Sequence, residues 1–236
     1  MSKVLIIINA EVREAGKILK MSLATERMVA ALKDAIAAHS PQPLAVEIIA
    51  APTLKSDKRF SQIDENAYIY CPLTIQLPDN FQFPGKKIYQ DCHDVQARRQ
   101  WVKERFGYAT TNQDSGSGHH WLPIVLTAKG PFYGEVIGEG EMPNSYQQPI
   151  DLTDEQRQPL YRLAYQLLDS LAAPPSVYLL QFTLGKKGII FDRLWPFPAA
   201  PATASIGKQQ PNLFTCHWHC LTGQPIRDIG IPASAS

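Results

Sequence analysis

The order of apolar and polar positions in the first fifth of the chain predicts a β-α-β unit. Residues 3–8 (KVLIII) form a continuous apolar run, which is typical of a strand buried on both faces of a parallel sheet. Ser22 caps a predicted helix that runs to about residue 39 and repeats apolar residues at helical spacing. A Pro-Gln-Pro breaker ends the helix, and residues 44–49 form the second strand. This order implies a right-handed crossover.

The pattern then becomes less regular. Residues 67–71 and 86–89 predict two short strands, and residues 95–106 predict a short amphipathic helix. The segment 108–120 is polar and rich in Gly and Ser, which indicates a loop or linker. We therefore expect a division into an N-terminal α/β domain and a C-terminal part, with a flexible linker between them. The expected bounds are 1–110, 111–121 and 122–236.

The C-terminal part is predicted to be a smaller α+β unit with antiparallel strands. Thr153 and Gln156 form a capping-box pattern that opens a helix ending near residue 171. Two of the later strands flank a Gly-Lys-Lys-Gly turn and should pair with each other. The strands are expected at residues 122–127, 133–137, 177–182, 189–194 and 212–220. The Pro/Ala-rich segment 195–205 is expected to be irregular.

Composition narrows the class of protein. The chain has 236 residues, and 44% of them are hydrophobic, which is enough for one α/β domain or two small ones. The net charge of +1 argues against a nucleic-acid binder, and no apolar run approaches the length of a membrane span. The first ten residues do not have the pattern of a secretory signal. A cytoplasmic location follows as an expectation, with the four cysteines as thiols.

Several segments of the chain resemble the ATP-grasp ligases of the glutathione-synthetase and ribosomal-protein-modifying type. Residues 149–201 contain LTDEQRQPLYRLAYQLL, SVYLLQF, GKKG and IIFDRLWPFP, which resemble the end of the catalytic domain of that family. Residues 122–128 (LPIVLTA) resemble the strand that carries an ATP-contacting lysine. The first half of the chain resembles the small N-terminal α/β domain of these ligases. The expected fold is therefore ATP-grasp-like.

This resemblance implies ATP and Mg²⁺ as cofactors and activation of a carboxylate as an acyl phosphate, which an amine or thiol then attacks. Lys129 would steady the ATP phosphates, Asp192 would hold Mg²⁺, and Arg193 would pair with a carboxylate or phosphate. Two positions depart from the family pattern: Thr127 stands where the lysine is usual, and Leu194 stands where a second metal ligand, an Asn, is usual. The departures imply a ligase function that is weak or lost.

The segment 216–220 (CHWHC) has the highest density of potential metal ligands. On the predicted strand, His217 and His219 would point to one face, a spacing that suits two imidazole ligands of Zn²⁺. His93 or the loop histidines at 119–120 could supply a third ligand. The alternative is packing, in which the tryptophan and the two cysteines are buried and the histidines hold no metal.

The segment 91–94 (DCHD) allows two interpretations. Cys92 beside His93 could form a nucleophile pair, whereas Asp91 or Asp94 could simply cap the helix that follows. The basic side chains of that helix are expected on its solvent face. They are Arg98, Arg99, Lys103 and Arg105.

A second class of function remains open beside the ligase. The segment 195–201 combines Trp195, Phe197 and three prolines, and such a rigid apolar stretch could dock a partner in a non-catalytic binding or assembly protein. It could equally be a buried crossover. The sequence names no particular substrate, small-molecule ligand or protein partner.

Overall fold

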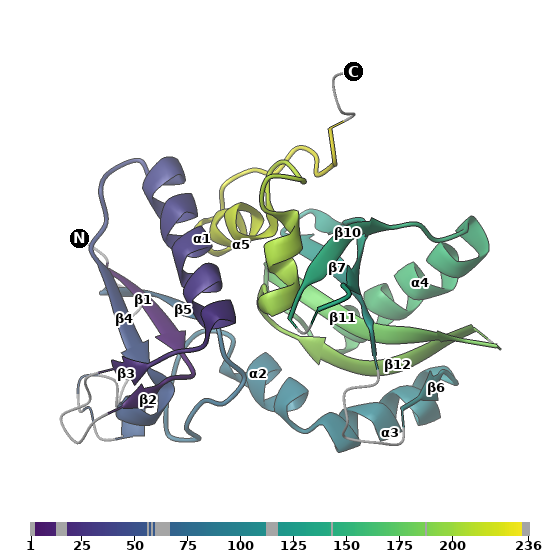
Figure 1. The fold of residues 1–236 in the computed structure, drawn as a ribbon. Coiled ribbons are helices and arrows are strands. Elements are labelled where there is room, and N and C mark those ends of the chain that lie inside the picture. Colours follow the sequence, from purple (N-terminus) through teal and green to yellow (C-terminus); the bar gives the residue numbers. More distant parts are fainter. Residues whose placement is uncertain are drawn as a thin grey trace.

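A computed structural model describes most of the chain. The described residues are 3–12, 18–55, 57, 59, 67–111, 118–142, 144–186 and 188–232. Two main sheets lie side by side, and the N-terminal parallel unit is followed by an antiparallel part (Figure 1). None of the helices in the described ranges is long and apolar enough to cross a membrane.

The first sheet is parallel and has the strand order β4-β1-β5. Its strands are β1 (Lys3–Ile8), β4 (Val46–Ala50) and β5 (Tyr68–Pro72). The five residues after Lys3 in β1 are all fully buried, as the continuous apolar run predicts. Burial of each such side chain stabilises the fold by about 1.5–3 kcal/mol.

Helix α1 (Leu23–His39) connects the first two of these strands. The side chain of Ser22 accepts a hydrogen bond from the backbone N–H of Thr25 at 3.1 Å, which confirms the predicted cap. The buried face of α1 carries Met28, Val29, Ala31, Leu32, Ala35 and Ile36. A short hairpin of β2 (Glu11–Val12) and β3 (Ile18–Lys20) precedes the helix, and the 3-10 helix η1 (Ala51–Lys55) follows β4.

The second sheet has the order β10-β9-β7-β11-β12-β6, and β8 pairs with β7. All pairings are antiparallel except that of β6 with β12. The strands are β6 (Ala109–Thr110), β7 (His120–Thr127), β8 (Gly130–Tyr133), β9 (Val136–Glu139), β10 (Tyr146–Ile150), β11 (Ser176–Gly185) and β12 (Gly188–Trp195). Helix α4 (Asp154–Ser170) contacts β12 and begins with the predicted capping box.

Two predicted strands are helices. Residues 86–89 begin α2 (Lys86–His93), which buries Ile88, Tyr89 and Cys92 on one face. Residues 212–220 fall largely in α5 (Leu213–Thr222), which starts at Asn212 as N-cap and ends at Gly223 in the left-handed conformation. The second strand prediction was wrong because a segment buried nearly all round has no polar face to mark a helical period.

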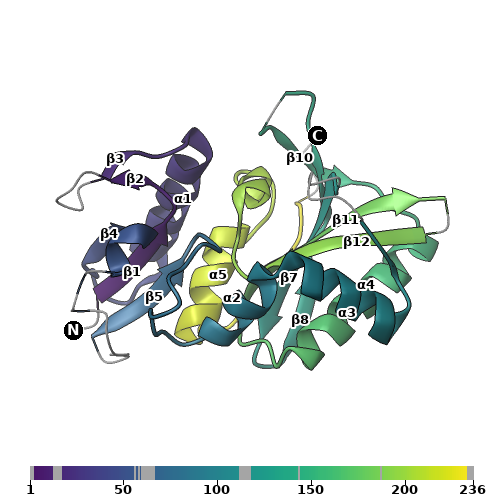
Figure 2. The same cartoon turned by 90° about the horizontal axis from the view of Figure 1, so that it is seen from below.

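Helix α5 joins the two halves of the molecule. It packs against α1 and against β7 and β11, and it lies between the two sheets in both ribbon views (Figures 1 and 2). The chain reaches it through residues 196–199 and the 3-10 helix η3 (Ala200–Ser205). Phe197 is buried and stacks on Tyr89 with ring centroids 5.9 Å apart, so this stretch is a buried crossover rather than an exposed docking segment.

The predicted boundary near residue 110 stays a prediction. Strand β6 ends just before it and pairs with β12, so the chain has entered the second sheet by residue 109. Most of the predicted linker, residues 112–117, lies outside the described residues, and His120 and Trp121 belong to β7.

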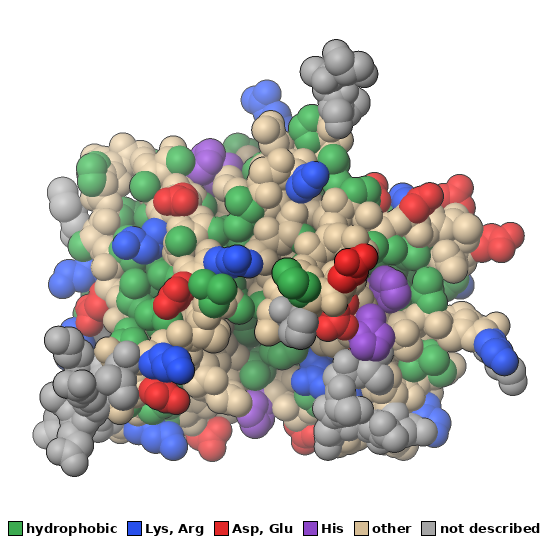
Figure 3. All heavy atoms as spheres, viewed as in Figure 1, with side chains coloured by type: hydrophobic (Ala, Val, Ile, Leu, Met, Phe, Trp, Pro, Cys, Tyr) green, Lys and Arg blue, Asp and Glu red, His purple; other side chains and the backbone are tan. Residues whose placement is uncertain are grey.

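All four cysteines are buried thiols, as expected. Side chains of both charges are interspersed over the face in Figure 3.

Candidate functional site

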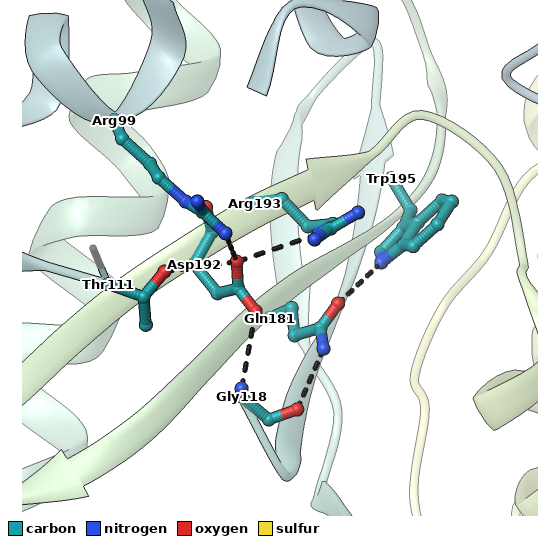
Figure 4. A network of polar contacts seen from close by, with 7 residues as sticks. All are labelled: Arg99, Thr111, Gly118, Gln181, Asp192, Arg193 and Trp195. Atoms are coloured by element: carbon teal, nitrogen blue, oxygen red, sulfur yellow. Dashed lines mark hydrogen bonds and ion pairs between the residues drawn. The ribbon is translucent and has the colours of Figure 1, made fainter. Parts of the chain in front are cut away.

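Asp192 lies at the centre of a buried polar network on β12 (Figure 4). Its side chain is fully buried and forms an ion pair with Arg99 of α3 (Val95–Phe106), whose Nε also donates to the Asp192 backbone oxygen at 3.0 Å. The hydroxyl of Thr111 and the backbone N–H of Gly118 each donate to the carboxylate at 3.2 Å. The carboxylate oxygens are therefore engaged by groups of the protein itself.

Arg99 was predicted on the solvent-exposed face of its helix, and that prediction is wrong. Only 2% of its surface is exposed, because α3 packs that side chain against β12. Lys103 and Arg105 are exposed as expected. Asp94 caps α3 by accepting a hydrogen bond from the Ala97 N–H at 3.0 Å, which confirms the capping interpretation. A buried charge needs an opposite charge nearby, and Asp192 supplies it to Arg99.

Arg193 lies beside this ion pair and approaches Asp192 to 3.6 Å between Nε and Oδ1. Strict alternation along a strand places these neighbouring residues on opposite faces, but the register between β11 and β12 shifts at Gln181 and Phe182. The guanidinium of Arg193 lies over the ring of Trp195 at 5.6 Å.

A chain of hydrogen bonds connects the network to a cleft. Gln181 donates from Nε2 to the Gly118 oxygen at 2.7 Å, and its Oε1 accepts from the Trp195 indole N–H at 3.0 Å. Both ends of the Gln181 amide are thus used, and the indole of Trp195 is held in place on one edge (Figure 4).

The cleft has a volume of about 380 Å³ and lies between the two sheets. Asn9 follows β1 and residues 73–76 follow β5, so one wall is formed by the carboxyl ends of two parallel strands, where open α/β sheets bind ligands. Strands β7, β10, β11 and β12 supply the opposite wall. The described lining residues are all uncharged: Asn9, Met28, Leu73, Thr74, Ile75, Gln76, Trp121, Tyr146, Gln181, Trp195, Phe197, Ala199, Ala200 and Pro201.

Aromatic rings and side-chain amides are the chemical groups of this cleft that could contact a ligand. Trp121 meets Tyr146 edge-to-face at 5.4 Å, and Trp195 meets Phe197 in the same way at 6.0 Å. Burial, with a smaller effect of nearby Glu139, raises the pKa of Tyr146, so its hydroxyl stays neutral. The side chains of Asn9 and Gln76 are exposed and make no hydrogen bond to another described residue. Such a lining suits a planar ring with a hydrogen-bonding edge.

The structure does not bring Lys129 and Asp192 together. Lys129 is exposed in the turn between β7 and β8, whereas the register places Asp192 near Trp121, at the other end of β7. At about 3.4 Å per residue the two positions are roughly 25 Å apart along the sheet. The two residues therefore lie at opposite ends of the sheet.

The three predicted metal ligands also lie apart. On helix α5, successive residues turn by about 100°, so His217 and His219 point to different sides. His217 is buried against Ser176, the ring of His219 meets that of His39 at 4.9 Å, and His93 ends α2. In the described part of the chain, no group of three His, Cys, Asp or Glu side chains could hold a metal ion. The strand geometry behind the metal prediction was wrong.

Comparison with known proteins establishes the fold. No protein-family model matches the sequence, and no curated protein matches it significantly. Among solved structures, the chain is similar to N5-carboxyaminoimidazole ribonucleotide synthetase from Thermus thermophilus, with a TM-score of 0.67 and 12% identity over 95% of this chain and 79% of that one. Such likeness at low identity concerns the fold.

Two further structures agree. Glycinamide-RNase-transformylase T from Mycobacterium tuberculosis has a TM-score of 0.64 and 12% identity over 95% of this chain and 82% of that one. The Aspergillus clavatus N5-carboxyaminoimidazole synthase, solved with ADP and 5-aminoimidazole ribonucleotide, has a TM-score of 0.66 and 7% identity, with 96% and 78% covered. These structural neighbours are ATP-grasp ligases, and the fold of this chain is ATP-grasp-like.

Proposed function

We propose that this protein binds a small organic molecule with a planar ring in the cleft between its two sheets, without a metal ion. The observation that carries the proposal is the uncharged lining of a 380 Å³ cleft at the carboxyl ends of β1 and β5. Aromatic rings form one wall, and two exposed amides, those of Asn9 and Gln76, make no side-chain hydrogen bond within the described ranges. The ring would pack against the aromatic side chains, and the amides of Asn9 and Gln76 would form hydrogen bonds with its polar edge.

The state of Asp192 supports binding without metal. Mg²⁺ prefers carboxylate oxygens and keeps several waters, whereas this carboxylate is buried and already paired with Arg99. A metal ion there would displace the guanidinium and leave it buried without its partner, at a cost of several kcal/mol.

Thermal melting with a panel of ring compounds tests the proposal. We would use indole, benzamide and the purine and pyrimidine bases, each with and without Mg²⁺, and record the protein as purified by native mass spectrometry. A ligand at 100 times its Kd stabilises the folded state by about 2.7 kcal/mol, which is a measurable shift. We expect at least one ring compound to raise the melting temperature equally with and without Mg²⁺.

Matched variants locate the binding. Gln76→Ala should weaken the best compound by about three- to tenfold, the value of one hydrogen bond. Gln90→Ala is the control, because Gln90 is also exposed but lines a different pocket beside α2. If no compound binds at millimolar concentration and no molecule travels with the purified protein, the proposal is wrong.

ATP-dependent ligation of a carboxylate to an amine or thiol is the second candidate, favoured by the ATP-grasp-like fold. It requires stabilisation by ATP that depends on Mg²⁺, together with release of phosphate. If that pattern is found and Lys129→Ala abolishes it, the ligase function replaces the metal-independent one. If Mg²⁺-ATP at millimolar concentration produces no shift, the ligase function is excluded.

A further inference from the structure

Arg193 lies beside the cleft, in contact with residues that line it. It is the cross-strand neighbour of Gln181 and lies two residues before Trp195, and both of these residues line the cleft. The three side chains project to the same side of β11 and β12 (Figure 4). About a fifth of the Arg193 side chain is exposed, so part of it is open to a ligand.

The guanidinium of Arg193 is only partly satisfied. Its Nε is shielded from solvent and makes no hydrogen bond to a described residue, because 3.6 Å to Asp192 is an ion-pair distance and too long for a hydrogen bond. The oxygens of Asp192 accept instead from Arg99, Thr111 and Gly118. Arginine has five N–H donors and cannot lose its charge, so this one keeps donors for another acceptor.

The guanidinium is also oriented in advance. It rests over the Trp195 ring, and the Trp195 indole is itself fixed by its hydrogen bond to Gln181. A guanidinium packed on an aromatic ring loses little freedom when it binds a planar, two-oxygen anion. The described residues that line the cleft are uncharged, so they offer such an anion no competing charged partner.

We propose that the ligand of this cleft carries an anionic group, a carboxylate or a phosphate, that Arg193 binds. The inference rests on the proposed function: the ring occupies the uncharged cleft, and the anionic substituent points past Trp195 to the guanidinium. The positively charged guanidinium of Arg193 would then contact the anionic group of the ligand directly.

Matched pairs of probes test this directly. Indole-3-carboxylate is compared with indole-3-carboxamide, and phenyl phosphate with phenol, by titration calorimetry at low ionic strength. A charge-assisted hydrogen bond at a partly exposed site should make the anionic compound of at least one probe pair bind about tenfold more tightly than the neutral one. The pair that shows the preference identifies carboxylate or phosphate as the source of the charge. The preference should shrink as salt rises.

Three variants assign the effect. Arg193→Gln should remove the preference, and Arg193→Lys should keep part of it, since lysine retains the charge without the two-pronged geometry. Arg98→Gln is the control, because Arg98 lies over Trp101 at 5.2 Å in a comparable stack away from the cleft. Melting curves establish that each variant folds. If Arg193→Gln does not fold, the Arg193→Lys variant decides the question, because its preference for the anionic member should be smaller than that of the unmodified protein.

The outcomes separate the two proposals. If ring compounds bind but the anionic and neutral members bind equally, or the preference survives in Arg193→Gln, the inference about Arg193 is overturned and the cleft remains a ligand site. If neither member of any pair binds to the unmodified protein, the proposed function fails, and this inference fails with it.

Discussion

Strands β1 and β12 are both buried, but they are stabilised in different ways. The interior of β1 is aliphatic from Val4 to Ile8, and its neighbours on both sides belong to the same parallel sheet. Strand β12 buries a carboxylate, Asp192, whose partner Arg99 comes from a helix 93 residues earlier in the chain. The buried side chains of β1 are stabilised by exclusion of water, whereas β12 adds a specific buried ion pair to its apolar side chains.

The fold should therefore be most sensitive to single changes of charge at β12. An aliphatic strand tolerates small changes in shape, because neighbouring side chains can shift. A buried ion pair does not tolerate the loss of one partner, because the remaining charge has no water to solvate it. Three substitutions test this contrast.

Asp192→Asn should produce the largest loss. It keeps the size of the side chain but leaves the Arg99 guanidinium buried without a countercharge, which should lower the free energy of unfolding by about 3–5 kcal/mol. Urea unfolding followed by circular dichroism measures this. In β1, Ile6→Val should cost only about 0.5–1.5 kcal/mol.

Asp151→Asn is the control for the change in charge, since the Asp151 side chain is 98% exposed and its ion pair with Arg157 should contribute about 0–1 kcal/mol. A loss of less than 1 kcal/mol for Asp192→Asn would mean that the ion pair does not hold β12 to α3.

His217 provides the pH-dependent test. Burial lowers its pKa to about 3 from an ordinary 6.5, and its Nδ1 accepts a hydrogen bond from the Val177 N–H. Between these two pH values His217 binds a proton in the unfolded chain but not in the folded protein. The free energy of unfolding therefore falls as the pH decreases from about 6.5 toward 3. His217→Asn should lose less stability than the unmodified protein over that range.

Unfolding of both proteins at pH 7, 5.5 and 4.5 isolates this effect, because all other titrating groups are shared. Identical pH profiles would mean that His217 binds a proton as readily in the folded protein as in the unfolded chain. In contrast to Asp192, this side chain is tolerated in the core because it is neutral there.

Gly118→Ala should have the smallest of the three effects. A Cβ at this position would lie 2.8 Å from Cγ of Gln181 and 3.1 Å from the Asp192 side chain, so both contacts of the network would have to shift. We expect a loss of about 1–3 kcal/mol and a change in the fluorescence of Trp195, which Gln181 orients. Gly230→Ala is the matched control, because a Cβ there meets nothing within 4 Å. Equal stability of the two variants would contradict the close packing at Gly118.

Local signals in the sequence predicted much of the fold. The apolar run of β1, the cap at Ser22, the capping box at Thr153 and the cap at Asp94 are short-range patterns, and the structure confirms each one. Helix α5 was missed because its apolar and aromatic residues cover most of its surface, although Asn212 before it and Gly223 after it are helix-terminal signals.

The site was less predictable, for a physical reason. Asp192 was identified from the family resemblance as a metal ligand, but its actual partner depends on how α3 packs on β12, which no local pattern records. The cleft combines Asn9, residues 73–76 and side chains of four later strands. Its existence follows from the packing of two sheets and not from any motif.

The position of α5 between α1 and the second sheet has a consequence for the order of events during synthesis. Helix α1 ends at His39, and the helix that covers it begins at Leu213, roughly 170 residues later. At about 5–20 residues per second, a ribosome needs on the order of 10–40 s to make that intervening chain. Throughout that interval, the side of α1 that α5 will cover lacks the helix that packs on it in the folded protein.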